Sequence, residues 1–132
     1  MIAVVDYGRG NLGSVEKALS GLGMRAVITE DPRVVGEAEA VVLPGDGAFH
    51  DAMATLQVLG LLEPIRACLD EGRPFLGICL GYQLLFTESE EFGQGKGLDV
   101  IPGAVRGDSE WLFMRGRAEW DACRLFRGVR AG

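Results

Sequence analysis

Short apolar runs rich in β-branched residues alternate with segments of helical periodicity over most of this chain. The apolar runs predict strands, and they lie at 2–7, 25–29, 39–45 and 74–78. The helical segments lie at 12–23, 46–57, 61–72 and 80–90. Strands that alternate with helices pair in parallel and are covered on both faces. The sequence therefore predicts an α/β fold with a doubly wound, mostly parallel sheet and helices on both faces.

The first helical segment carries its own start and stop signals. One face of it is apolar, through Leu12, Val15, Leu19 and Leu22. Asn11 precedes this face and is predicted to cap the helix through its side-chain oxygen. Gly23 follows and is predicted to end the helix.

Composition excludes several classes of partner. The chain has 13 basic and 19 acidic side chains and a net charge of −6, which argues against nucleic acid or an anionic membrane. No apolar stretch approaches the length of about 18 residues that a spanning helix needs, and the N-terminus does not resemble a signal peptide. The chain has 3 cysteines, an odd count that predicts free thiols and a cytoplasmic location.

The segment 107–132 differs from the rest in composition. It holds both tryptophans and five arginines but no lysine or proline, and its net charge is +1 against −7 for residues 1–106. Its apolar residues have only partial helical spacing, and the alternating pattern does not continue into it. We therefore expect one domain segment over 1–106 and an anomalous tail over 107–132, which is either disordered or the product of a frameshift.

The cysteine at the end of the fourth predicted strand lies between two glycines, in Gly77-Ile78-Cys79-Leu80-Gly81. This is the form of a nucleophile elbow, a tight strand-to-helix turn that presents a reactive side chain at the carboxyl edge of the sheet. The helix N-terminus would favour the negative charge of a thiolate, and the Leu80 N–H would point at an oxyanion. The alternative is a small buried hydrophobe with glycines that allow close packing.

Two further segments need an interpretation. Cys68 shares a helix face with Leu61 and Ile65, so it is predicted to be a core residue. The loop Pro44–Gly47 follows the third predicted strand and would place backbone N–H groups at the same edge of the sheet as Cys79. It is either a second source of oxyanion donors or an ordinary strand-to-helix turn.

Four stretches together resemble one enzyme family. They are "DYGRGNLGSVEKAL", "VVLPGDGAF", "PFLGICLGYQLLFTESEE" and "GKGLDVIPGAV". In this order they are similar to the glutaminase subunits of imidazole glycerol phosphate synthases, which are class I glutamine amidotransferases of histidine biosynthesis. The resemblance runs from residue 1 to about residue 106. It implies a flavodoxin-like fold whose C-terminal part is missing from this chain.

The resemblance also implies roles for individual residues. Cys79 would attack the side-chain amide of glutamine, and Gly47 and Leu80 would belong to the oxyanion hole. Gln83 and Glu91 would hold the amino-acid end of the glutamine. Glu88 and Glu90 are expected to be solvated charges. No cofactor and no metal ion is expected.

A partner subunit is implied as well. In the family, the ammonia passes to a (β/α)8-barrel cyclase, which forms a heterodimer with the glutaminase and makes imidazole glycerol phosphate. Asn11 matches a position near that interface. Two alternatives stay open, namely another class I amidotransferase, such as one of pyridoxal phosphate or anthranilate synthesis, and a non-catalytic flavodoxin-like binding module.

The chain departs from the family in its catalytic base. Class I amidotransferases use a Cys-His-Glu triad whose His and Glu come late in the chain, whereas this sequence has one histidine, His50, and no His-x-Glu. His50 matches no base position and is expected to be a surface or helix-packing residue. We therefore expect a truncated, frame-shifted or divergent chain that does not turn over glutamine.

Overall fold

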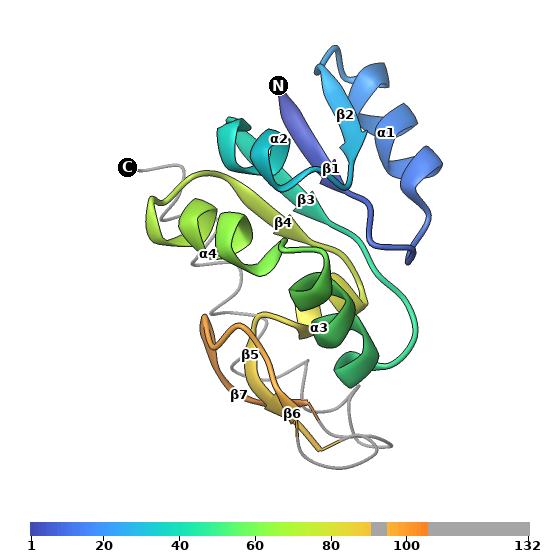
Figure 1. Cartoon of the computed structure of the whole chain (residues 1–132). Helices are drawn as coiled ribbons and strands as arrows, with labels where there is room; N and C mark the ends of the chain where they lie inside the picture. The colour runs from blue at the N-terminus through green and yellow to red at the C-terminus, as the bar shows by residue number, and fades with distance from the viewer. Residues whose placement is uncertain (91–94, 106–132) are drawn as a thin grey trace.

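The computed structural model describes residues 1–90 and 95–105, and its centre is a parallel sheet of four strands (Figure 1). The strands are β1 (Ile2–Val5), β2 (Ala26–Thr29), β3 (Ala40–Leu43) and β4 (Phe75–Gly77), in the order β2-β1-β3-β4. All three pairings are parallel. The four predicted strands are therefore confirmed, and this order is that of the flavodoxin-like doubly wound sheet.

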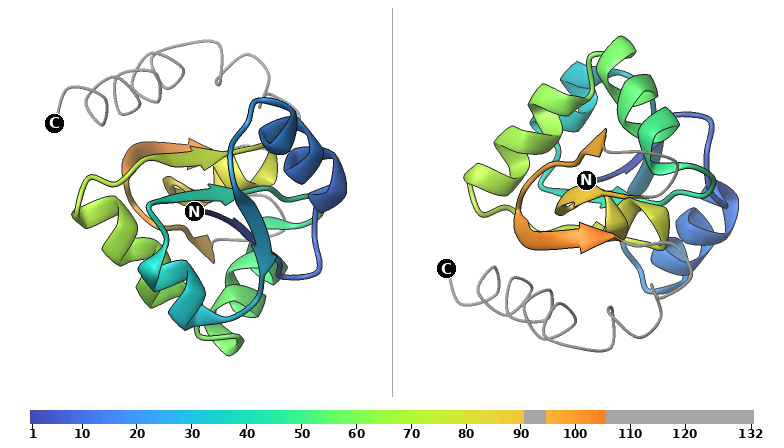
Figure 2. Two further views of the ribbon diagram at one scale, coloured as in Figure 1. Left: turned by 90° about the horizontal axis from the view of Figure 1, so that it is seen from above. Right: turned by 90° about the horizontal axis from the view of Figure 1, so that it is seen from below.

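Within the described residues, five helices follow these strands along the chain. They are α1 (Leu12–Gly21), α2 (Pro32–Glu37), α3 (Phe49–Val58), α4 (Leu62–Asp70) and α5 (Leu80–Gln83). Crossover connections between parallel strands are right-handed. Because β2 lies on one side of β1 and β3 and β4 lie on the other, α1 covers one face of the sheet and α2 and α4 cover the opposite face. Figure 2 shows this arrangement, with α1 in blue across the sheet from α2 in cyan and α4 in light green. The predicted cover on both faces is confirmed.

A second, smaller sheet follows α5. Its strands are β5 (Phe86–Ser89), β6 (Gly95–Lys96) and β7 (Ile101–Val105), in the order β6-β5-β7. β5 pairs with β7 in parallel and with β6 antiparallel. This sheet was not predicted from the sequence, and it lies beside α3 below the main sheet in Figure 1.

The core lies between the main sheet and the helices. β1 and β3 supply fully buried valines and Leu43, and α3 and α4 supply Phe49, Leu56 and Ile65. Cys68 is 0% exposed within this cluster, so its predicted core role is confirmed. Burial raises the pKa of the Cys68 thiol.

The predicted ends of the first helix are also confirmed. The Asn11 side chain accepts a hydrogen bond from the Ser14 amide at 3.2 Å, as an N-cap does. Gly23 follows the helix with φ +77, a left-handed conformation that suits glycine. The helix α2 was not predicted, although Asp31 caps it and Pro32 is its first residue, a recognised start signal.

Two predicted helices have other bounds. The segment 80–90 is wrong as one helix, because α5 ends at Gln83 and Phe86 begins β5. After Gln83 the backbone makes hydrogen bonds with the chain that follows Gly95 in place of those of a longer helix. For example, the Leu98 amide donates to the Leu84 carbonyl at 2.7 Å. The helix predicted for 46–57 begins at Phe49 instead, because Asp46 and Gly47 belong to the loop that precedes it.

Within the described residues, no single helix is long and apolar enough to cross a membrane, and α3 and α4 meet such a test only as a pair bent by 98°.

Candidate active site at a strand–helix elbow

Cys79 lies on a sharp turn between β4 and α5. Its φ of +54 and ψ of −118 are rare for a residue with a side chain. Such a conformation costs on the order of 1–3 kcal/mol and persists where the surroundings enforce it. The thiol is exposed and not in a disulfide. The prediction of a strand-to-helix elbow at Cys79 is thus confirmed in its geometry, and the alternative of a buried hydrophobe is wrong.

The two flanking glycines have no room for a side chain. A Cβ at Gly77 would lie 2.7 Å from the Cα of Tyr82 and 2.8 Å from the Gly81 carbonyl oxygen. A Cβ at Gly81 would collide with the backbone carbonyl of Leu43, at the end of β3. The turn is therefore packed backbone against backbone on both sides of Cys79.

The loop Pro44–Gly47 lies against this elbow. A Cβ at Gly45 would lie 3.1 Å from both the Gly81 amide nitrogen and the Leu80 Cβ, and it would collide with the Tyr7 hydroxyl. The predicted meeting of the two segments at one sheet edge is confirmed. Among the described residues, the amides of Gly47 and Leu80 donate to no acceptor.

The segment after β1 braces the same loop. The Tyr7 hydroxyl is buried and donates to the Pro44 carbonyl at 2.8 Å. The Arg9 Nη1 donates to the Asp46 carbonyl at 3.2 Å. No role at the site was predicted for Tyr7 or Arg9, although both lie in the stretch that opens the family resemblance. The parallel pairing of β1 with β3 brings 7–10 and 44–47 together.

Burial raises the pKa of Tyr7 well above its usual value, with the Arg9 charge opposing this shift and the Asp46 charge adding to it. The phenol therefore stays protonated at neutral pH and keeps its hydrogen bond to the loop.

The other predicted site residues have the following places. Leu80 is buried at the start of α5, and Gln83 is half-buried at its end. Asn11 is exposed and caps α1. Glu91 lies outside the described residues, as do Cys123 and the tail 107–132.

His50 is half-buried in α3. Its imidazole lies at Gly95 of β6, where a Cβ would collide with it, and makes an edge-to-face contact with the Phe49 ring at 6.1 Å between centroids. This agrees with the expected helix-packing role. Of the two glutamates expected to be solvated, Glu90 is exposed, whereas Glu88 is half-buried and stands opposite Lys96 in the pairing of β5 with β6.

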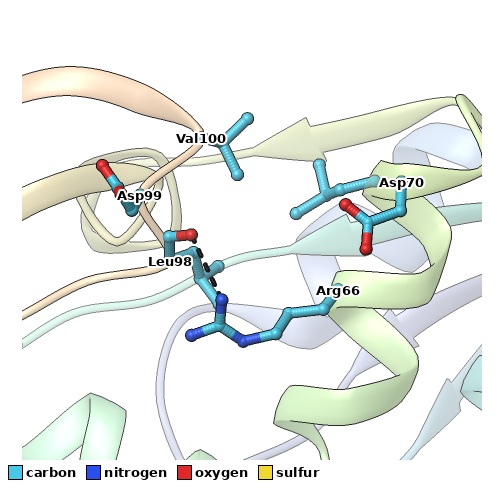
Figure 3. Close-up of a pocket in the computed structure, with 6 residues that line it drawn as sticks. Arg66, Asp70, Leu98, Asp99 and Val100 are labelled. Carbon is cyan, nitrogen blue, oxygen red and sulfur yellow. Dashed lines mark hydrogen bonds between the residues drawn. The ribbon is translucent and has the colours of Figure 1, made fainter.

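A pocket of roughly 280 Å³ lies elsewhere, between α4 and the chain that leads into β7. Figure 3 shows the Arg66 guanidinium reaching the Leu98 carbonyl across it, at 3.4 Å, with Asp70 and Asp99 at its margins. None of its lining residues belongs to the elbow or to the loop 44–47. Within the described part of the chain, no group of three or more His, Cys, Asp or Glu side chains could hold a metal ion.

Comparison with known proteins agrees with this geometry. The model of the family "Glutamine amidotransferase class-I" matches residues 3–123. The imidazole glycerol phosphate synthase subunit HisH of Geobacter metallireducens is 56% identical over 115 residues, which are 87% of this chain and 55% of that protein. The HisH subunit of Moorella thermoacetica is 56% identical over an alignment of 137 residues, covering 99% of this chain and 65% of that protein.

A crystal structure of a glutamine amidotransferase superposes with a TM-score of 0.67 at 21% identity, covering 80% of this chain and 56% of the other. This likeness shows the shared fold. The chain spans about half the length of curated relatives that it matches. The matches to the family model and to the Moorella protein extend past residue 106, where the resemblance found by motif ended. Because the family model covers nearly the whole sequence and the fold agrees with it, this chain belongs to the class I glutamine amidotransferase family.

Proposed function

We propose that this chain is the nucleophile-bearing part of a glutaminase subunit of imidazole glycerol phosphate synthase, with Cys79 as the nucleophile. The observation that carries the proposal is the exposed Cys79 thiol on a turn with φ +54, enclosed by backbone that leaves no room for side chains at Gly77 and Gly81. Relatives 56–59% identical that are named as HisH subunits support the choice within the family.

In the proposed reaction, the Cys79 thiolate attacks the carbonyl carbon of the glutamine side-chain amide. A C–S bond forms, the C–N bond breaks, and the nitrogen takes up a proton and leaves as ammonia. Water then hydrolyses the glutamyl thioester to glutamate and frees the thiol. The amides of Leu80 and Gly47 would donate to the oxyanion of each tetrahedral intermediate.

The glutamine itself would be held at its amino-acid end by Gln83 and Glu91. Gln83 belongs to the one-turn helix that begins directly after Cys79, so it is near the nucleophile in the chain. A carboxylate such as that of Glu91 pairs directly with a substrate ammonium group.

The ammonia would pass to a cyclase partner of the (β/α)8-barrel type, in a heterodimer that makes imidazole glycerol phosphate, with Asn11 near the interface. The word "subunit" in the names of the relatives supports an assembly. A cytoplasmic location is part of the proposal, and the free thiols of Cys68 and Cys79 suit a reducing compartment.

Turnover also needs a group that moves protons. A positioned acid or base contributes about 10²–10⁴ in rate. The 132-residue chain has a single histidine, which packs against Gly95 and Phe49. We therefore expect this chain alone to form an acyl-enzyme at most once and not to cycle.

The test is glutamate release from glutamine by the purified chain with a cyclase subunit and its ligand present, beside a Cys79→Ala control. We expect less than one turnover per chain. Multiple turnovers that disappear in the control would show that His50 or another group acts as the base and would refute this part of the proposal.

A second experiment separates this function from the alternatives. The full-length gene is tested for complementation of a histidine auxotroph that lacks its own glutaminase subunit, and growth would support the assignment to imidazole glycerol phosphate synthase. A chain that binds the cyclase but never reacts with glutamine would instead be a non-catalytic binding module.

The nucleotide sequence after codon 106, read in three frames, tests the predicted frameshift. A continuation that encodes His-x-Glu in another frame would support the frameshift.

A further inference from the structure

We propose that Arg9 is a positioning residue that orients the Asp46–Gly47 peptide of the loop beside Cys79. The proposal rests on the proposed function, because it concerns an amide that would stabilise the oxyanion. No family motif identified in the sequence assigned a role to Arg9.

Two contacts place the Arg9 guanidinium on this peptide. Its Nη1 donates to the Asp46 carbonyl oxygen at 3.2 Å. The same nitrogen occupies the space where a Cβ of Gly47 would lie. The guanidinium therefore holds the carbonyl on one side of the peptide and packs against the following Cα.

The planarity of the peptide turns this contact into an orientation of the next amide. No peptide bond in the described residues is cis, so the Asp46 C=O and the Gly47 N–H point in opposite directions. Holding the carbonyl toward Arg9 directs the Gly47 N–H away from the 7–10 segment. Gly47 has φ +87, and glycine loses much conformational freedom when it is held in one state, so an external contact is needed to fix it.

The two segments that this contact joins, 7–10 and 44–47, also pack against each other at two other points. The Tyr7 hydroxyl donates to the Pro44 carbonyl at 2.8 Å, and a Cβ at Gly10 would lie 2.9 Å from the Gly45 amide nitrogen. The 7–10 segment is thus packed closely on the first half of the loop, and the Arg9 side chain donates a hydrogen bond to the second half.

The test compares two reagents that label Cys79 in the 132-residue chain. A chloromethyl ketone that carries the amino-acid end of glutamine passes through an oxyanion when the thiolate adds to its carbonyl. Iodoacetamide is displaced at carbon and forms no oxyanion. Labelling of Cys79 is followed by mass spectrometry in the parent chain, in Arg9→Ala and in Arg9→Lys. Arg33→Ala is the matched control, because Arg33 is an exposed arginine on α2 paired with Asp31 at 3.3 Å.

We expect Arg9→Ala to slow the ketone reaction about tenfold, because a misplaced donor weakens oxyanion stabilisation. The iodoacetamide rate should stay within about twofold, because it depends on thiolate fraction and access. Arg9→Lys should recover part of the ketone rate, and Arg33→Ala should change neither rate.

Other results would overturn the proposal in distinguishable ways. An unchanged ketone rate in Arg9→Ala would mean that Arg9 does not orient the amide, while the proposed function stands. An equal loss of both rates would mean that Arg9 only maintains the fold of the elbow. A parent chain whose ketone reaction is not slowed by added glutamine would contradict the proposed function and the role of Arg9 with it.

Discussion

The carbonyl group of Leu43 occupies the place where a side chain at Gly81 would begin. The same carbonyl accepts a hydrogen bond from the Ile78 amide at 3.0 Å. The last residue of β3 therefore contacts the elbow at a residue before Cys79 and at a residue after it. This double contact holds the turn against the sheet and leaves the chain little freedom to relax around Cys79.

Replacement of Gly81 by alanine should destabilise the protein by about 3 kcal/mol or more, since a methyl group would force backbone apart in a packed region. The measurement is urea unfolding followed by circular dichroism. Gly13→Ala is the control, because Gly13 lies in α1 and a Cβ there would meet no atom within 4 Å. That change should stabilise the protein by about 0.5–1 kcal/mol. A Gly81→Ala variant as stable as the parent would contradict the packing described for the elbow.

Cys79→Gly should be more stable than Cys79→Ala by about 1 kcal/mol or more, because glycine adopts φ +54 without the strain that a side chain brings. Both variants lack the thiol, so the comparison isolates the backbone. Thermal unfolding under identical conditions measures the difference. A Cys79→Ala variant that equals or exceeds Cys79→Gly in stability would show that the elbow is not strained.

Cys79 should react with iodoacetamide much faster than Cys68 in the folded protein near neutral pH. Cys79 is exposed, whereas Cys68 is 0% exposed and burial raises its thiol pKa, which lowers its thiolate fraction. Peptide mapping by mass spectrometry after short reaction times measures each rate. Denaturant should bring the two rates together, and equal slow labelling without denaturant would contradict an exposed nucleophile.

Tyr7→Phe should cost about 1–2 kcal/mol near neutral pH, because the buried Pro44 carbonyl loses its donor. It should also change the response to alkali. The pKa of Tyr7 is raised in the folded state, so above about pH 10 the unfolded chain loses a proton that the folded chain keeps. The free energy of unfolding of the parent should therefore fall with rising pH in this range more steeply than that of Tyr7→Phe. Parallel slopes from about pH 9 to 11 would rule out a buried phenol at this position.

The sequence by itself determined the main sheet and the nucleophile turn. Runs such as 2–5 and 40–43 are apolar and β-branched, so they could be recognised as strands without knowledge of their neighbours. Asn11 and Gly23 act within one helix, and Gly77 packs against the backbone of Gly81 and Tyr82 within one turn. These features depend on residues close in the chain, so local pattern was sufficient to predict them.

Only the tertiary structure decided the second sheet and the surroundings of the thiol. The segment after Gln83 is apolar enough for a helix, and it becomes β5 because residues 95–105 offer backbone partners that no local pattern reveals. Likewise, Tyr7 and Arg9 reach Pro44 and Asp46 only because β1 and β3 are parallel neighbours that end at the same edge. Contacts between distant segments depend on pairing and packing of the whole chain, and the local spacing of residues does not encode them.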